Sequence, residues 1–382
     1  MFVSLQRQST KRMEKKRKEC DKDNRRAFVA VVCLMAFSLS MLSCGGKGVR
    51  RSDADADTLT MRYARNIALV NHTGYTEAII YNPWQEGSIL SRYEIRKPLT
   101  HSAIFIASVA SLVEELGELA SIGGVCEPEY IANPNLLSAI GDGRIRDLGS
   151  AMTPSRERII DLAPDAILLS PFQNVGNYGN IEQLGIPIIP CADYMERSAL
   201  ARAEWMRFYG RLFGCGERAD SLFDALEARY YRIKNTRAEE SQSTEAPTVF
   251  FDGRNGSAWY MPGGQSTLGQ LVADAGGRYI FASNEQSGSV PFSFEQVYDR
   301  CRDADIWLYR YNAPRRLTLD LLRSEYEPYS RFCAFKEGNV FGCNNAENIF
   351  FEEYPFHPDL LLNDFVRIFA GEADSLRYFH RL

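Results

Sequence analysis

The sequence predicts an α/β protein of two lobes with parallel-rich, Rossmann-like sheets. One long connector helix joins the lobes, and a small antiparallel strand appendage precedes them. The chain has 382 residues, 45% apolar and 12% aromatic, which is enough for two cores. Short apolar runs alternate with helical patterns in both halves of the chain, which is typical of βαβ units. Between them, residues 195–240 contain no Pro and are helical in pattern nearly throughout.

The first 43 residues have the organisation of a secretory signal peptide. A basic segment ending at Arg26 precedes residues 27–42, an uncharged run shorter than the roughly 20 residues that a spanning helix needs. An uncleaved signal anchor is the alternative, and translation starts at either Met1 or Met13.

The end of this run resembles a bacterial lipobox. The small residue Ser43 precedes Cys44, although Met41 stands where Leu is usual. The resemblance implies cleavage before Cys44 and lipidation of its sulfur, giving an exported lipoprotein anchored to a membrane and facing the periplasm. The sequence does not specify which membrane of the cell holds the anchor.

Export changes the charge balance. Residues 1–43 carry ten Lys and Arg against four Asp and Glu, so their removal takes the formal net charge from −5 to −11. An acidic mature chain argues against a nucleic-acid partner. The remaining cysteines show no CxxC spacing, so no zinc or redox motif is predicted. Their pattern is compatible both with free thiols and with disulfides. They are Cys126, Cys191, Cys215, Cys301, Cys333 and Cys343.

The local patterns predict the elements in order. Strand-like segments at Ile67–His72, Glu77–Tyr81 and Ile89–Arg96 form the appendage. Residues 154–170 in the first lobe and 291–309 in the second repeat one unit, in which a helix, a turn and an Asp-led apolar strand follow one another.

Several segments in register resemble the helical-backbone substrate-binding proteins of ABC importers, the class that serves cobalamin, ferric siderophores and haem. They are residues 158–170, 184–191 and 259–277, together with the long connector. The resemblance covers roughly residues 100–370, and residues 191–214 are most similar to the lipoprotein members of Bacteroidetes.

The resemblance implies a monomeric binding protein without catalytic activity or a resident cofactor. It would hold a metal chelate, a cobamide or a ferric siderophore, between two lobes and deliver it to the permease and ATPase of an ABC importer. The connector helix would keep the opening of the lobes modest. The expected segments are a signal peptide (1–43), a lipidated tether (44–62), an N-terminal lobe with the appendage (63–194), a helical connector (195–240) and a C-terminal lobe (241–382).

Aromatic side chains at strand ends suit a planar or macrocyclic chelate, because they offer broad contact at low entropic cost. An Arg among them would pair with a ligand carboxylate or phosphate, and a Glu would be a polar anchor. The alternative for each such residue is that it only packs in the core or lies on the surface, without contacting a ligand. The candidates are Glu129, Tyr130, Tyr178, Tyr194, Trp259, Tyr260 and Arg310.

Haem binding is the alternative within the same class, and it requires an axial ligand. None of the four His residues falls in an expected cleft loop. Tyr130, Tyr178, Tyr260 and Met261 are the remaining candidates.

The resemblance also implies that one acidic residue on each lobe docks into the permease. Glu157 and Glu295 occupy equivalent positions in the repeated unit, each near the start of a helix, where the helix dipole also favours a carboxylate.

A surface lipoprotein that works with an outer-membrane receptor is a second alternative function. An exported α/β enzyme is a third, although GxSxG, HExxH and Walker signatures are absent and no metal site is predicted.

Overall fold

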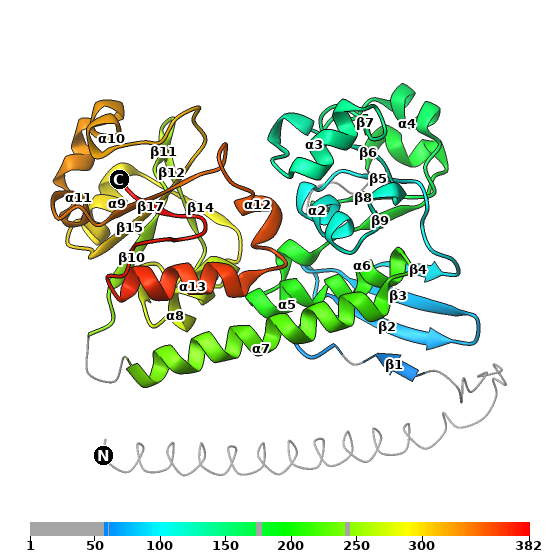
Figure 1. Cartoon of the computed structure of the whole chain (residues 1–382), viewed down its shortest axis with the longest axis horizontal. Coiled ribbons are helices and arrows are strands. Elements are labelled where there is room, and N and C mark those ends of the chain that lie inside the picture. Colours follow the sequence, from blue (N-terminus) through cyan, green and yellow to red (C-terminus); the bar gives the residue numbers. More distant parts are fainter. Residues whose placement is uncertain (1–56, 60, 173–177, 241–244) are drawn as a thin grey trace, which may run out of the picture. The chain divides into compact units, whose positions relative to one another are not determined.

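The computed structural model describes residues 57–59, 61–172, 178–240 and 245–382, and Figure 1 traces their path. Within this part of the chain, no helix combines the length and the apolar character needed to cross a bilayer. The six cysteines of the folded body are all free thiols.

The predicted appendage is an antiparallel sheet of order β1-β2-β3-β4. Its strands are β1 (Asp57–Leu59), β2 (Ile67–His72), β3 (Tyr75–Tyr81) and β4 (Ile89–Ile95). The three predicted segments are strands, and their bounds differ from the predicted ones by at most two residues. The addition is β1, which pairs with β2 although it falls within the segment expected to be a flexible tether.

The N-terminal lobe has a fully parallel sheet of order β7-β6-β5-β8-β9. Its strands are β5 (Ser102–Ile104), β6 (Ile122–Val125), β7 (Arg146–Asp147), β8 (Ile167–Leu169) and β9 (Ile188–Pro190). The connecting elements are α2 (Ala107–Glu115), η1 (Leu119–Ser121), η2 (Pro128–Tyr130), α3 (Pro134–Gly141), α4 (Arg156–Leu162), η3 (Gly179–Leu184) and η4 (Asp193–Met195). This is a doubly wound order, because the chain adds β6 and β7 on one side of β5 and then β8 and β9 on its other side.

The connector consists of α5 (Ala199–Glu204), α6 (Met206–Leu212) and the long helix α7 (Gly216–Glu240). The break before α7 falls at Gly214, which has φ +78°, as the Gly-Cys-Gly step predicts. Helix α7 packs against α6 at one end and, further along, against α13 (Pro358–Phe369) of the second lobe, so it runs beneath both lobes (Figure 1).

The C-terminal lobe has a mixed sheet of order β13-β10-β15-β16-β17, in which only β17 is antiparallel. Its strands are β10 (Thr248–Phe251), β13 (Arg278–Tyr279), β15 (Ile306–Tyr311), β16 (Val340–Asn344) and β17 (His380–Arg381). A second, antiparallel sheet contains β11 (Arg254–Asn255), β12 (Ala258–Pro262) and β14 (Ser289–Phe292). The helices are α8 (Thr267–Asp274), α9 (Phe294–Cys301), α10 (Leu319–Glu325), η6 (Glu327–Arg331), α11 (Cys333–Lys336), α12 (Phe350–Glu353) and α13 (Pro358–Phe369).

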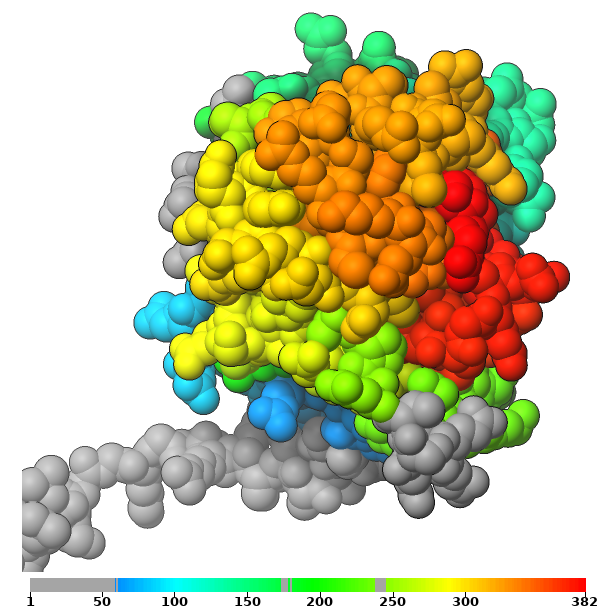
Figure 2. All heavy atoms as spheres, turned by 90° about the vertical axis from the view of Figure 1, so that its left-hand side faces the viewer, coloured from blue at the N-terminus to red at the C-terminus, as the bar shows by residue number. Residues whose placement is uncertain are grey.

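An aromatic cluster fills the core of the C-terminal lobe. Phe250, Trp259, Trp307 and Phe332 are fully buried and lie ring against ring, with centroids 5.1–6.2 Å apart. Figure 2 looks onto this lobe, and the yellow and orange segments that include α8 to α11 cover much of the face.

Together, the two lobes, the connector and the first sheet confirm the predicted two-lobe α/β architecture with its antiparallel appendage.

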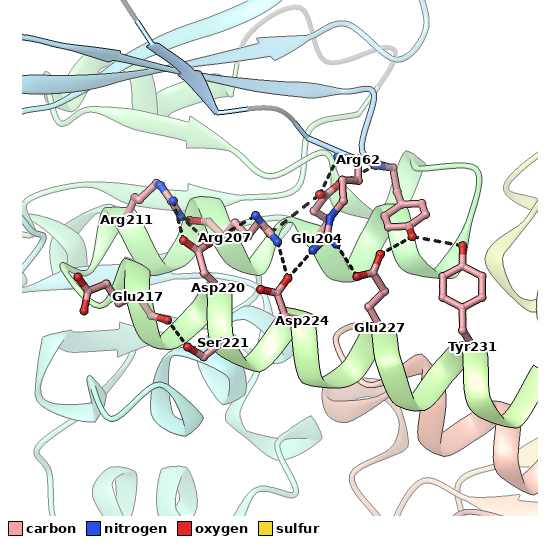
Figure 3. Close-up of polar contacts among 11 residues, drawn as sticks. Arg62, Glu204, Arg207, Arg211, Glu217, Asp220, Ser221, Asp224, Glu227 and Tyr231 are labelled. Carbon is pink, nitrogen blue, oxygen red and sulfur yellow. Dashed lines mark hydrogen bonds and ion pairs between the residues drawn. The ribbon is translucent and has the colours of Figure 1, made fainter.

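The residues just before β2 fasten the chain onto the connector, and we call residues 61–66 the N-terminal strap. The backbone N–H groups of residues 62–64 donate to the fully buried carboxylate of Glu204, at 2.8 Å each. The guanidinium of Arg62 also forms an ion pair with Asp224 on α7 (Figure 3). Residues 61 and 62, which were expected to be tether, are therefore part of the folded body.

Candidate functional site

A cavity of about 830 Å³ lies between the two lobes. The N-terminal lobe lines it with the start of α2, with η2 and with the start of α3. The C-terminal lobe lines it with the residues after β15 and β16, with α12 and with the segment before β17. The volume falls within the range of roughly 300–1,000 Å³ typical of small-molecule sites.

The sheet topology explains why the cavity is here. Ala107 and Glu129 follow β5 and β6 in the first lobe, and Asn312 and Asn345 follow β15 and β16 in the second. All four strands are parallel within their sheets, so their carboxyl ends open on one edge of each lobe. Ligands of open α/β sheets bind at that edge. The two edges face the same cavity, which makes it the candidate ligand site.

Exposed apolar side chains gather in this cavity. Tyr130 is 67% exposed, Phe351 is 50% exposed and Leu137 is 43% exposed, and all three line it. Tyr130 and Leu137 belong to the N-terminal lobe and Phe351 to the C-terminal lobe. We call Tyr130 and Phe351 the aromatic clamp. Large apolar side chains left accessible on facing lobes are typical of a ligand site.

The polar lining is mostly acidic. Glu129 is exposed at the cavity, and no hydrogen bond or ion pair with another described residue involves its carboxylate. Glu353 accepts two hydrogen bonds from the guanidinium of Arg377, at 2.6 and 2.5 Å, and a third from the hydroxyl of Tyr378. Glu347 pairs with Arg316 at 2.8 Å.

Glu352 of α12 lines the cavity and bridges the two lobes. Its carboxylate accepts hydrogen bonds from the backbone N–H groups of Ala132 and Asn133, at 2.6 and 3.3 Å, and from the hydroxyl of Ser111 at 2.8 Å. Burial raises the pKa of Glu352, and the three hydrogen bonds act against that rise. We call these four residues the inter-lobe latch.

A second contact between the lobes lies beside the latch. His357, at the start of α13, lies 2.8 Å from Glu115 at the end of α2. Burial alone would lower the pKa of His357, but the hydrogen bond and charge of Glu115 outweigh it, and the pKa is raised. Both residues line a smaller cavity of about 220 Å³, which shares Ile349, Glu352 and Glu353 with the lining of the main one.

Two of the sequence-predicted ligand residues, Glu129 and Tyr130, line the inter-lobe cavity. Tyr178 and Tyr194 do not line it. The hydroxyl of Tyr194 donates to the backbone carbonyl of Pro171, and burial raises the pKa of both tyrosines to about 12. Both therefore contribute to packing within the N-terminal lobe.

The prediction that Trp259 and Tyr260 lie in a ligand-binding loop is corrected by the structure. Both belong to β12, where successive side chains point to opposite faces. Trp259 is fully buried, and its indole N–H donates to the carbonyl of Phe251 at 2.9 Å. Tyr260 is 46% exposed but lies outside the inter-lobe cavity.

Arg310 is not free to bind a ligand anion, contrary to the prediction. Its guanidinium makes two hydrogen bonds to Asp252, at 2.7 and 2.6 Å, and both side chains are largely buried. It also lies 5.7 Å from the ring centroid of Phe351. Arg310 therefore contacts one half of the aromatic clamp and is not among the residues that line the cavity.

The candidate docking residues Glu157 and Glu295 lie where the sequence places them. Each is exposed in the first turn of its helix, α4 or α9, and each helix is capped by the serine two residues earlier. Hydrogen bonds from its own backbone N–H and from Ser293 lower the pKa of Glu295. The positions are equivalent in the two lobes, while their docking role stays a prediction.

Haem and metal ligation find limited support in the side chains. Of the four axial candidates, only Tyr130 lines the inter-lobe cavity, and Met261 is fully buried. In the described part of the chain, no cluster of three or more His, Cys, Asp or Glu residues is arranged to hold a metal ion. Cys44, the predicted lipidation site, lies outside the described residues.

Sequence reasoning missed Phe351, Leu137, Arg377 and the asparagines at 312 and 345. The aromatic run around Phe351 was a usable signal, because it follows a strand of the second lobe. The asparagines directly after β15 and β16 were a weaker one.

A family model described as periplasmic binding protein matches residues 107–346. Two uncharacterized lipoproteins of Methanocaldococcus jannaschii are each 24% identical, one over 259 residues and the other over 284. The first alignment covers 65% of this chain and 60% of the relative, and the second covers 67% and 66%. The chain thus spans less than two thirds of the length of these relatives.

Solved structures share the fold at low identity. A periplasmic haem-binding protein from Pseudomonas aeruginosa is 17% identical with a TM-score of 0.57, covering 74% of this chain and 97% of that one. A protein of an ABC-type Fe3+-hydroxamate transport system from Saccharomonospora viridis is 18% identical with a TM-score of 0.55, covering 73% and 94%. A periplasmic binding protein from Veillonella parvula is 15% identical with a TM-score of 0.58, covering 75% and 96%. At these identities the likeness shows the fold alone.

Proposed function

Since the chain belongs to the periplasmic binding protein family, we propose that it captures a metal chelate between its lobes and delivers it to the permease of an ABC importer. The observation that carries the proposal is the inter-lobe cavity, lined by the carboxyl ends of strands from both lobes and by the aromatic clamp. Family membership also agrees with the prediction that the chain is not an enzyme.

The side chains that line the cavity support a chelate as the ligand. Its apolar side chains come from both lobes, so a flat or macrocyclic ligand would touch each of them at once. Two solved relatives of the same fold are described as a haem-binding protein and as part of an Fe3+-hydroxamate transport system, which favours this ligand class. The long helix α7 spans both lobes and would limit their separation during capture and release.

Ligand affinity of clamp variants tests the proposal. We expect Tyr130→Ala and Phe351→Ala each to weaken binding by about 1–3 kcal/mol, because each removes one apolar wall of the site. Equilibrium dialysis of the purified protein against cyanocobalamin, haem and ferric hydroxamates measures the affinity.

Tyr260→Ala is the matched control, because Tyr260 is similarly exposed but lies outside the cavity. It should bind like the unaltered protein. The proposal fails if none of these chelates binds, or if Tyr260→Ala weakens binding while both clamp variants leave it unchanged.

We further propose that the protein is exported and held to a membrane through a lipid on Cys44. The curated relatives named as lipoproteins and the family's periplasmic designation support this. Metabolic labelling with palmitate should mark the processed protein that begins at Cys44 and should be lost in Cys44→Ala. Equal labelling of the variant would rule the site out.

Glu157 and Glu295 are proposed as the contacts with the permease. Both are exposed at equivalent helix starts of the two lobes, so a two-fold permease could engage them in the same way. The double replacement by Ala should abolish stimulation of the importer's ATPase by the liganded protein and leave chelate affinity intact, because such pairs set encounter and register. The control is the double replacement of the exposed residues Glu86 and Glu285 by Ala. It removes the same charge and should leave the ATPase stimulation intact. Full stimulation by the Glu157/Glu295 variant would exclude this docking mode.

A further inference from the structure

The charges that line the inter-lobe cavity are unbalanced. Among its described lining residues, Glu129, Glu347, Glu352 and Glu353 carry carboxylates, and Arg377 is the single cationic side chain. Neither Lys nor His is among them. A ligand that enters this cavity therefore meets a surplus of negative charge.

The nearby guanidinium groups are already occupied by carboxylates of the protein. Arg377 uses two nitrogens on Glu353, and Arg310 uses two on Asp252. Arg316, beside the cavity, pairs with Glu347. The positive charge of each of these guanidinium groups is already largely balanced by a protein carboxylate, so each offers an incoming anion little net attraction.

Two of the four lining carboxylates have no cationic partner among the described residues. Glu352 is satisfied by neutral donors, namely two backbone N–H groups and a hydroxyl. Glu129 is exposed to the cavity and has no such donors. Glu129 is therefore the charge that a ligand would meet directly on the N-terminal lobe.

The remaining polar lining is uncharged. Asn312 and Asn345 line the cavity from the ends of β15 and β16, and each amide offers both donors and an acceptor. Amide or hydroxamate groups on a ligand match this lining, whereas carboxylates and catecholates find no unpaired cation among the lining residues that the structure describes.

We infer that the cavity selects chelates of zero or positive net charge whose polar groups are amides or hydroxamates, and rejects polyanionic chelates. The inference rests on the proposed function and names the ligand class of the same site. Corrinoids and ferric trihydroxamates share the required chemistry. Haem, with two propionates, and ferric tris-catecholates, with three negative charges, do not. In a cleft of reduced dielectric, like charges a few ångströms apart repel much more strongly than in water.

A panel of probes that differ in charge tests the selection. Equilibrium dialysis would compare a cationic ferric trihydroxamate, a neutral one, cyanocobalamin, haem and a ferric tris-catecholate. We expect the affinity for at least one neutral or cationic probe to exceed that for both anionic probes by about tenfold or more, since like-charge contacts oppose binding strongly. Separate isotherms for the corrinoid and the trihydroxamates distinguish the two sources of the shared chemistry. Raising the salt concentration should narrow the gap, because screening weakens the repulsion.

Charge variants at Glu129 identify the origin of the selection. Glu129→Gln should raise the affinity for the tris-catecholate severalfold, and Glu129→Lys should raise it further. Glu285→Gln removes the same charge from an exposed residue that does not line the cavity, and should leave every affinity unchanged.

The outcomes separate the inference from the function on which it rests. If haem or the tris-catecholate binds more tightly than all the neutral and cationic probes, and does so through the clamp, the charge selection is wrong and the chelate-binding function stands. If Glu129→Lys leaves the affinity for the anionic probes unchanged, the selection is likewise overturned. If no probe binds, both the function and the inference fail.

Discussion

Replacement of Trp259 by Ala is expected to lower the free energy of unfolding by about 3–5 kcal/mol, the range for removing a large aromatic side chain from a packed core. Trp259 is fully buried against Phe250, Trp307 and Tyr329, with ring centroids 5.6–6.2 Å away. Truncation would leave a cavity that these rings cannot easily fill. Urea denaturation followed by far-UV circular dichroism measures the change.

Two companion variants make this result specific. Trp259→Phe keeps most of the ring contacts and loses the hydrogen bond to Phe251, so it should be destabilised less than the Ala variant. Tyr260→Ala alters the neighbouring, half-exposed position and should stay within about 0.5 kcal/mol of the unaltered protein. An unchanged free energy of unfolding in Trp259→Ala would contradict the core position.

The misplacement of Trp259 has a local cause. The segment before it makes a tight hairpin, in which Asn255 pairs with Ala258 around Gly256 and Ser257, and Gly256 has φ +61°. A two-residue Gly-Ser turn between short strands is a recognised hairpin signal. The sequence therefore contained the information that Trp259 lies in a strand, but the Gly-rich composition favoured a loop interpretation.

The elements that could be predicted are those whose signal is local. The appendage strands alternate with turn residues, and α7 keeps a helical pattern without a Pro, so each is specified by its own segment. The repeated helix–turn–strand unit placed Glu157 and Glu295 correctly at helix starts for the same reason.

The site itself depended on contacts that no local pattern reveals. Ser111 and Glu352 are 241 residues apart in sequence, and their hydrogen bond exists only because the two lobes meet. The aromatic clamp likewise combines Tyr130 with Phe351. Arg310 was a reasonable candidate for an anion until the fold placed Asp252 beside it, because a strand-end Arg gives no sign of its partner.

Replacement of Glu352 by Ala is expected to lower the free energy of unfolding by about 3 kcal/mol, because it removes three hydrogen bonds to a carboxylate at once. Two backbone N–H groups and the hydroxyl of Ser111 would lose their acceptor in a buried place between the lobes. Chemical denaturation measures the stability. Paired spin labels, one on each lobe, measure the distance between the lobes, which should grow longer and more broadly distributed.

Glu352→Gln is the informative control for the latch. It keeps the side chain's size and one carbonyl acceptor, but turns an NH₂ group toward a donor, so its effect should be intermediate. Both variants should also bind the chelate more weakly, because a smaller fraction of molecules would hold the lobes at the closed separation that the ligand needs. An unchanged inter-lobe distance together with unaltered stability in Glu352→Ala would show that the latch does not hold the lobes, and α7 and the His357–Glu115 contact would then have to set their separation.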